Sequence, residues 1–253
     1  MQNRYVADIG DFGKFQLFRF LFNAPSPLAD NTLAQIWFLH ENEESNNDGR
    51  HINYFERVKG SDVPLEAIML ELLKEDRRYV KELEKVKVLD NVHFYYPHIP
   101  ENYHDRKVWL EEALHFSKES QVVAVAPDNG MALKCHREEK SFSLLNYHDR
   151  KSTPHKYIFD NEIDAFYNVE NRKITIVYQH LGRCFSHDKQ IEALLELLKS
   201  RYTHIIAIKH KPYSPRVFFF LCKNERVLEV LQNRLEDFAK QHSAFWKVYR
   251  ANG

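Results

Sequence analysis

The sequence predicts an α/β protein whose mainly parallel sheet is covered by helices on both faces and ends in an antiparallel hairpin. Short, nearly continuous apolar segments alternate with amphipathic helical patterns along most of the 253 residues. Continuous apolar segments are typical of strands buried on both faces, which is the condition of a parallel sheet between two helical layers. With 43% hydrophobic residues the chain can bury one large core, so we expect a single domain over residues 1–253.

The predicted strands are rich in β-branched and aromatic residues. They cover residues 36–39, 92–96, 122–126, 174–178, 205–208 and 217–221. Only the short segment 209–216, with Pro212 and Pro215, joins the last two, and so short a connection predicts an antiparallel hairpin. A mainly parallel sheet with an antiparallel strand at its end is typical of the methyltransferase version of the Rossmann-like fold, and the sheet of a nuclease would fit the same pattern.

Apolar residues at helical spacing predict the helices between these strands. They cover residues 63–80, 104–116, 190–198 and 227–238, and a further helical pattern runs over residues 17–22. Two polar segments, 41–50 and 134–156, are predicted to be loops. The first directly follows a predicted strand, where ligands bind in an open α/β sheet, whereas the second is predicted to be a surface excursion.

Charge and cysteine content narrow the class of protein. The 36 basic and 36 acidic residues balance, so nucleic-acid binding would require a local basic patch. We interpret Cys135, Cys184 and Cys222 as reduced thiols, because three scattered cysteines make no disulfide framework and no CxxC metal pair. No apolar stretch reaches the length of a signal segment or a membrane span, so we predict a soluble, cytoplasmic protein without a membrane partner; its oligomeric state stays open.

The central candidate site is the turn Pro127-Asp128-Asn129-Gly130, which directly follows the predicted strand 122–126. A carboxylate and an amide on a tight turn at a strand end have three uses: to accept protons from a base amino group, to ligate a metal, or to bind a ribose. An Asx-type turn closed by Gly130 is the structural alternative.

Two more candidate groups follow other predicted strands. Glu41, Asp48 and Arg50 lie in the polar segment after strand 36–39, where the acids would meet a cofactor ribose or a metal and Arg50 an anion. His180 follows strand 174–178, and its imidazole is suited to a general base or a metal ligand. A solvated loop and a hydrogen-bonded strand cap are the structural alternatives for these residues.

A fourth candidate group precedes the helical pattern of residues 17–22. Asp11 is predicted to cap this helix, and Lys14 would lie in its first turn. A positive charge is unfavourable there, which suggests a ligand for Lys14, with a solvated lysine as the alternative. Because the carboxyl ends of parallel strands share one edge of a sheet, we expect all four groups to lie together.

The segments DIGDFGK, NNDGRH, PDNG and YQHLGR resemble a widespread group of bacterial proteins, a resemblance that implies no particular activity. The order of elements also resembles the adenine-N6 methyltransferase family that modifies large-subunit ribosomal RNA. That family's opening G-N-x-x-D-V-x-K-H segment aligns with residues 7–15 at Asp11 and Lys14, and its D-P-P-Y motif aligns with residues 126–129. Its later strand ending in W-Y-P corresponds to residues 174–179.

This second resemblance implies a Rossmann-like fold, S-adenosylmethionine as cofactor and a nucleic-acid substrate. The family uses the acid and the proline carbonyl of D-P-P-Y to accept the amino hydrogens of adenine, while the aromatic residue stacks on the base. In this chain Ala126 stands at the position of the first acid, the acid is Asp128, and Asn129 replaces the aromatic residue.

The leading hypothesis is a methyltransferase-like enzyme acting on a nucleic acid or nucleotide. Asp128 and Asn129 would orient the acceptor, and Glu41 or Asp48 would meet the cofactor. The first alternative is a metal-dependent nuclease or phosphoester hydrolase. Its Mg²⁺ or Mn²⁺ would be held by Asp48, Asp128 and His180, with Arg50 or Lys14 on the phosphate.

The second alternative is a non-catalytic binding module on the same fold. The aromatic run Phe94, Tyr95 and Tyr96 would then face a partner, although burial in a strand explains these residues equally well.

Overall fold

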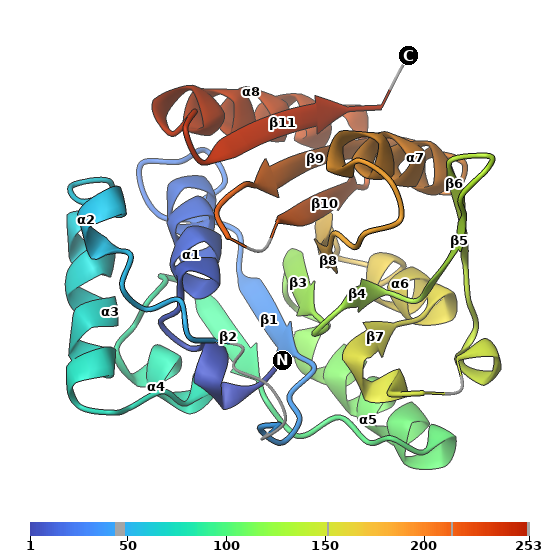
Figure 1. Cartoon of the computed structure of the whole chain (residues 1–253), viewed down its shortest axis with the longest axis horizontal. Helices are drawn as coiled ribbons and strands as arrows, with labels where there is room; N and C mark the ends of the chain where they lie inside the picture. The colour runs from blue at the N-terminus through green and yellow to red at the C-terminus, as the bar shows by residue number, and fades with distance from the viewer. Residues whose placement is uncertain (44–48, 151, 214, 252–253) are drawn as a thin grey trace.

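The centre of the molecule is a seven-stranded mixed sheet with strand order β11-β9-β10-β8-β3-β1-β2 (Figure 1). The protein was analysed as a computed structural model, which describes residues 1–43, 49–150, 152–213 and 215–251. The strands are β1 (Leu33–Trp37), β2 (Val92–Tyr95), β3 (Val122–Ala126), β8 (Ile174–His180), β9 (His204–His210), β10 (Arg216–Cys222) and β11 (Trp246–Arg250). All six predicted strands are therefore present, and β11 was not predicted.

The sheet is not mainly parallel, and this part of the prediction is wrong. Three pairings, β2 with β1, β1 with β3 and β3 with β8, are parallel. Three others, β8 with β10, β10 with β9 and β9 with β11, are antiparallel. The hairpin of β9 and β10 was predicted correctly, but β10 inserts between β8 and β9, and β11 adds another antiparallel edge. The sheet thus has a parallel half and an antiparallel half.

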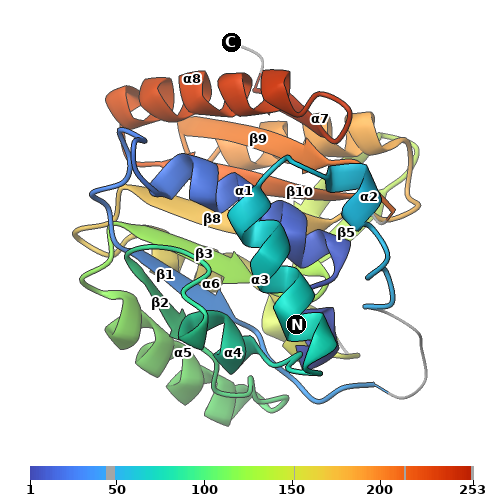
Figure 2. The same cartoon turned by 90° about the vertical axis from the view of Figure 1, so that its left-hand side faces the viewer.

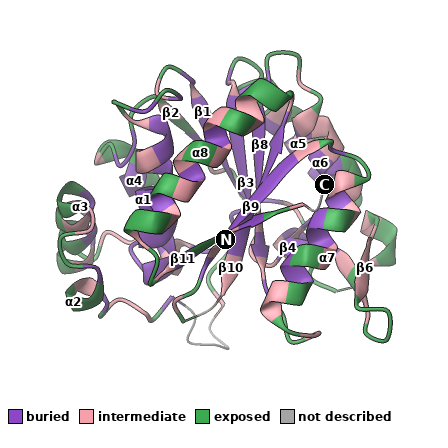
Figure 3. Ribbon diagram, turned by 90° about the horizontal axis from the view of Figure 1, so that it is seen from above, coloured by how far each residue is buried: buried purple, intermediate pink, exposed green. Residues whose placement is uncertain are grey.

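Helices cover both faces of the sheet, as predicted (Figure 3). One face packs against α1 (Ile9–Phe22), α2 (Phe55–Val58), α3 (Val63–Lys74), α4 (Val80–Lys85) and α8 (Glu225–Gln241). The other face packs against α5 (Tyr103–Ser117), α6 (Asp160–Tyr167) and α7 (His187–Lys199). Figure 2 shows α1, α3 and α8 in front of the sheet on the first face. None of the helices in the described ranges has the length and apolar composition to cross a bilayer.

The predicted helix 63–80 is two helices. Helix α3 ends at Lys74, and Asp76 then takes a left-handed conformation with φ 51°, which a helix does not continue through. Arg77 N donates to Leu72 O across this break, and α4 begins at Val80. Helical spacing continues in the sequence although the backbone turns, because apolar residues on both sides of Asp76 face the same core.

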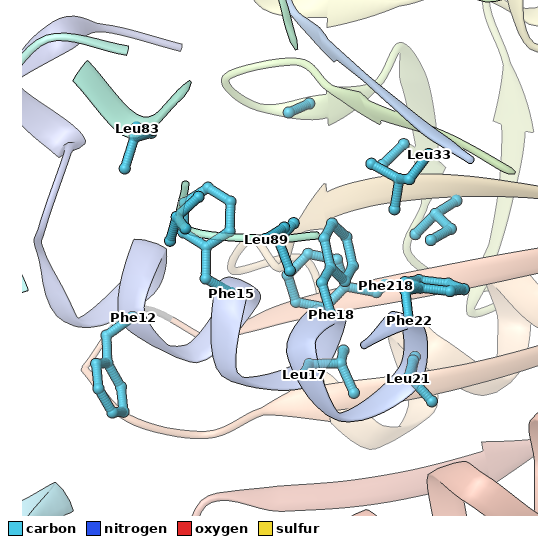
Figure 4. Packing of buried hydrophobic residues seen from close by; sticks show 14 of the residues in the cluster. Phe12, Phe15, Leu17, Phe18, Leu21, Phe22, Leu33, Leu83, Leu89 and Phe218 are labelled. Carbon is cyan, nitrogen blue, oxygen red and sulfur yellow. The ribbon is translucent and has the colours of Figure 1, made fainter. Parts of the chain in front are cut away.

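Helix α1 lies almost entirely inside the molecule, and Figure 4 shows its side chains among those of the sheet. Phe18 packs edge-to-face on Phe218 of β10, with ring centroids 6.0 Å apart. The N-cap of α1 is Asp8, whose Oδ1 accepts from Asp11 N at 2.8 Å, so the prediction that Asp11 caps this helix is wrong. The polar N-terminal end of α1 thereby reaches the edge of the sheet where β1 and β3 end.

The segment 134–156 is more ordered than the predicted surface loop. It contributes to the hairpin of β5 (Leu133–His136) and β6 (Ser141–Leu144), and it leads into β7 (Tyr157–Ile158). Strand β7 pairs in parallel with β4 (Gly130–Met131), which directly follows the turn at Asp128. This pairing places the end of segment 134–156 next to the turn at Asp128.

A disulfide joins Cys135 of β5 to Cys184, with a Cα–Cα distance of 6.6 Å. The interpretation of all three cysteines as reduced thiols is therefore wrong for this pair, whereas Cys222 is a free, buried thiol. The two bonded cysteines are 49 residues apart in sequence. Their spacing gave no signal, because the fold of the hairpin brings them together.

Candidate functional site

A cleft of about 500 Å³ opens at the carboxyl ends of β1, β3 and β8. In the sheet (Figure 1), the chain leaves β1 toward β2 on one side and leaves β3 toward β8 on the other. The residues that line the cleft therefore place it at the point where the strand order reverses. The N-terminal end of α1 and the start of β10 complete its walls. A volume of this size accommodates a ligand as large as a nucleoside.

Six of the eight candidate residues line this one cleft. They come from α1, from the loop after β1, from the turn after β3 and from the end of β8: Asp11, Lys14, Arg50, Asp128, Asn129 and His180. Glu41 does not line it, because its side chain is 90% exposed and pairs with His98 at 3.2 Å. Asp48 lies outside the described residues. The prediction that separate polar groups meet at one sheet edge is thus correct for the described residues except Glu41.

Lys14 and Asp11 form a buried ion pair on the cleft wall. Lys14 Nζ lies 2.6 Å from Asp11 Oδ1 and 3.8 Å from the centroid of the Trp37 ring, which follows from their positions one turn apart on α1 above the end of β1. Burial lowers the pKa of Lys14, and the neighbouring Asp11 opposes this shift. Lys14 is therefore not a solvated lysine; its charge is held by a carboxylate and an aromatic face.

Asp8 and Arg216 add a second pair of opposite charges beside the first. Burial raises the pKa of Asp8, and the nearby charge of Arg216 opposes that rise. The Arg216 guanidinium occupies the space that a Cβ at position 10 would fill, so a larger residue than Gly10 would displace this guanidinium. The sequence pattern Asp-Ile-Gly-Asp thus provides two carboxylates and an opening for an arginine from β10.

The turn at Asp128 is held rigidly by its neighbours. Asn129 N donates to Lys156 O at 2.8 Å, and Gln179 Oε1 accepts from Met131 N at 2.7 Å. Gly130 has φ 98° and lies against Gln179, a conformation and a closeness that both require glycine. The turn therefore presents Asp128 and Asn129 from a fixed backbone.

Asp128 carries the most strongly partnered carboxylate of the cleft. Its Oδ2 lies 3.1 Å from His40 Nε2, and its Oδ1 lies 3.8 Å from the Met1 amino nitrogen. Burial by itself would raise the pKa of Asp128, but the Met1 amino group and the His40 hydrogen bond hold this pKa below its usual range. Burial in turn lowers the pKa of the Met1 amino group to about 6. Asp128 is ionised and available as an acceptor at neutral pH.

Two histidines and a glutamate lie beside Asp128, and sequence reasoning missed all three. One ligand atom each of His40, Glu43 and His155 lies within 4.8 Å of the others. The rings of His40 and His155 are 4.8 Å apart, centroid to centroid. His40 directly follows a predicted strand and was detectable on that ground. His155 was not detectable, because the pairing of β7 with β4 brings it to the site.

The aromatic run of β2 is accounted for by the core. Phe94 and Tyr95 are 4% and 7% exposed, and Tyr96 packs against the same core. Burial in a strand, rather than a partner surface, explains these residues.

Comparison of the sequence with protein-family models and with curated proteins gives no match to either.

Proposed function

We propose that the protein is a methyltransferase-like enzyme that binds S-adenosylmethionine and a nucleic-acid or nucleotide acceptor in this cleft. The observation that supports the proposal is the meeting of buried carboxylates, fixed cations and aromatic faces at the strand-order reversal of the sheet. This is the position where cofactors bind in Rossmann-like folds. The resemblance to the rRNA adenine-N6 methyltransferase family points to the same chemistry.

The cofactor would lie against α1 and the end of β1. A sulfonium is a cation, so it is attracted to carboxylates such as Asp8 and Asp11 and to an aromatic face, which the partly buried Tyr5 would offer in the same cleft. Lys14 would keep Asp11 ionised beside it, since the two are 2.6 Å apart. In the described part of the cleft wall, carboxylates would thus face the sulfonium charge and an aromatic ring would face the adenosine.

The acceptor would lie against the turn after β3. Asp128 is positioned to accept hydrogens from an amino group that is about to be methylated, and Asn129 to fix the orientation of the base. Arg50 and Arg216 also line the cleft and carry the charge that a phosphate requires. His180 is the candidate for the removal of a proton.

Calorimetry and thermal shift with millimolar S-adenosylmethionine test the first step. We expect binding to the wild type and to Asp128→Asn, and we expect methyl transfer to nucleic acid or nucleotides to fall about 100-fold in Asp128→Asn, as for the loss of one positioned group. Glu41→Gln is the matched control, because its side chain lies outside the cleft, and it should bind and transfer as the wild type does. No heat and no thermal shift would end the proposal.

A metal-dependent phosphoester hydrolase is the second candidate. It is favoured by the position of Asp128 beside His40, Glu43 and His155 and by the cations that line the same cleft. It predicts Mg²⁺- or Mn²⁺-dependent cleavage of DNA or RNA that disappears in Asp128→Ala. Substrates that stay intact with every metal would remove this candidate.

A further inference from the structure

We propose that His40, Glu43 and His155, together with Asp128, bind a divalent metal ion of the Zn²⁺ type at the edge of the cleft. Histidine nitrogens and carboxylate oxygens are donors that zinc accepts. The ligand atoms of His40, Glu43 and His155 lie within 4.8 Å of one another, and the Asp128 carboxylate lies beside His40. The proposal does not depend on methyl transfer, because metal binding is measured without cofactor or acceptor.

The distances within the cluster suit one ion. Around a tetrahedral zinc with bonds near 2.0–2.2 Å, donor atoms lie roughly 3.3–3.6 Å apart. Asp128 Oδ2 and His40 Nε2 are 3.1 Å apart, and the ligand atoms of His40, Glu43 and His155 all lie within 4.8 Å. His40 and His155 are 8% and 7% exposed, so both rings are held by their surroundings. Side-chain rotations would have to close spacings of up to 4.8 Å to those around one ion.

The hydrogen-bond partners of His40 call for a cation at its Nε2. Nδ1 lies 3.0 Å from the Glu41 carbonyl oxygen, which can only accept, so Nδ1 carries a hydrogen. Nε2 faces the Asp128 carboxylate, which is also an acceptor, at 3.1 Å. A ring with a hydrogen on Nδ1 alone would direct a lone pair at this carboxylate, whereas the hydrogen bond to Asp128 needs a hydrogen on Nε2 as well. Either a second proton or a metal ion must lie between these two groups.

The far nitrogen of His155 also faces an acceptor. Its Nδ1 lies 2.9 Å from Glu101 Oε1, as an ion-pair contact without the alignment of a hydrogen bond. A carbonyl or carboxylate on the far nitrogen is the usual environment of a metal-binding histidine, because it fixes the tautomer and turns the other nitrogen to the ion. With Nε2 as the ligand atom, both histidines of the cluster would have this arrangement.

Lys156 is the competitor for the site. Its ammonium pairs with the Glu43 carboxylate, and hydrogen bonding from Lys156 lowers the pKa of Glu43. A metal ion would have to displace this ammonium from Glu43. The removal of the Lys156 charge should therefore strengthen metal binding, which a merely structural ion network would not show.

Titration of the metal-stripped full-length chain with ZnCl₂ and with MnCl₂ tests the proposal, with bound metal counted by elemental analysis. We expect one zinc per chain, an affinity at least about tenfold lower in His155→Ala, and a higher affinity in Lys156→Gln. Co²⁺ should give the intense visible bands of a four-coordinate ion. His136→Ala is the matched control, because the partly buried His136 lies outside the cluster and also faces a glutamate, Glu139, at 3.8 Å. Its zinc affinity should stay unchanged.

Three results would overturn the site. They are no zinc binding by the wild type, equal zinc binding by wild type and His155→Ala, or a Lys156→Gln affinity no higher than that of the wild type. The last comparison stays informative if His155→Ala folds poorly, because a gain of affinity requires a folded chain. Zinc binding without S-adenosylmethionine binding would contradict the proposed function and support the metal site. S-adenosylmethionine binding without zinc binding would contradict the metal site and leave the proposed function in place.

Discussion

Two buried ion pairs lie on opposite faces of the sheet, and they differ in how completely their polar atoms are satisfied. On the face of α5 and α6, Arg106 Nε donates to Glu162 Oε1 at 2.6 Å and Nη2 to Oε2 at 2.8 Å. The same guanidinium donates to the carbonyls of Pro154 and Tyr157, and Phe159 N donates to Glu162. This pair ties α5, α6 and β7 together outside the cleft.

On the other face, the pair of Lys14 and Asp11 borders the cleft and is incomplete. Asp11 Oδ2 is buried and has no hydrogen-bond partner among the described residues. A buried carboxylate oxygen without a donor costs stability, so a donor from a group bound in the cleft would lower this cost. The comparison teaches that burial of charge alone does not distinguish the two pairs. They differ in the hydrogen-bonding capacity that a bound group would use.

The largest expected effect is the loss of stability when the complete pair is broken. Arg106→Met leaves Glu162 buried without its partner and removes the donor to two carbonyls, so we expect the free energy of unfolding to fall by about 3–5 kcal/mol. Denaturant unfolding measures this change. The control is Arg250→Met, because Arg250 pairs with Glu236 on the surface at 59% and 39% side-chain exposure and should have little effect. If Arg106→Met lowered the free energy of unfolding no more than Arg250→Met, the Arg106–Glu162 pair would not have this structural role.

Removal of the incomplete pair of Lys14 and Asp11 should not lower the stability of the protein, unlike the loss of Arg106. Asp11→Asn/Lys14→Met removes both charges together, so stability should stay equal or rise by about 1 kcal/mol, since a buried ion pair seldom outweighs its desolvation. S-adenosylmethionine binding, measured by calorimetry, should be lost. Arg106→Met/Glu162→Gln is the matched double variant, and it should still lose stability because the carbonyls of Pro154 and Tyr157 lose their donors. Equal losses of stability in the two double variants would show that the two ion pairs do not differ in their contribution to stability.

Strands with a continuous apolar sequence could be predicted. Strands whose formation or position depends on pairing with distant segments could not. The strand at residues 122–126 is apolar throughout and is buried at every position, so its boundaries were correct. Strand β11 is a short edge strand with one fully buried tryptophan, Trp246, and a weak alternation. Nothing local distinguishes such a segment from the end of a helix. The insertion of β10 between β8 and β9 is likewise a property of the assembled sheet.

The site could be located from sequence, whereas its partners could not. Asp128 and His180 follow predicted strands, and the shared edge of parallel strands brings them together. Arg216 reaches the cleft from an antiparallel strand. His155 reaches the cluster with His40 and Glu43 from a segment predicted to be a surface loop. Both positions depend on chain pairings between distant segments, which leave no periodic trace. Asp8 was within a recognised motif, but the capping role was assigned to Asp11.

The smallest expected effect is on the pH dependence of stability, which should differ in sign between Asp8 in the cleft and Asp188 on the surface. Burial raises the pKa of Asp8 above its ordinary value of 3.8, with Arg216, Asp11 and Lys14 as its charged neighbours. The native chain therefore binds a proton that the unfolded chain has already released in the window above pH 3.8. The stability that Asp8 contributes is present below this window and is lost as the pH rises through it. Asp8→Asn keeps the helix cap and should remove this loss.

Asp188 supplies the comparison of opposite sign on the surface. Hydrogen bonds from Lys209, Lys247 and Tyr249 hold the pKa of Asp188 below its usual range, so its contribution is present above the ordinary aspartate pKa and is lost as the pH falls. Because its side chain is 46% exposed, solvent screens the effect. Denaturant unfolding across acidic to neutral pH should therefore show that Asp8→Asn gains stability over the wild type toward neutral pH, whereas Asp188→Asn loses a little. If Asp8→Asn instead lost stability as the pH rose, the Asp8 carboxylate would be stabilised by Arg216 more than burial destabilises it, and the cleft would hold a complete ion pair like that of Arg106.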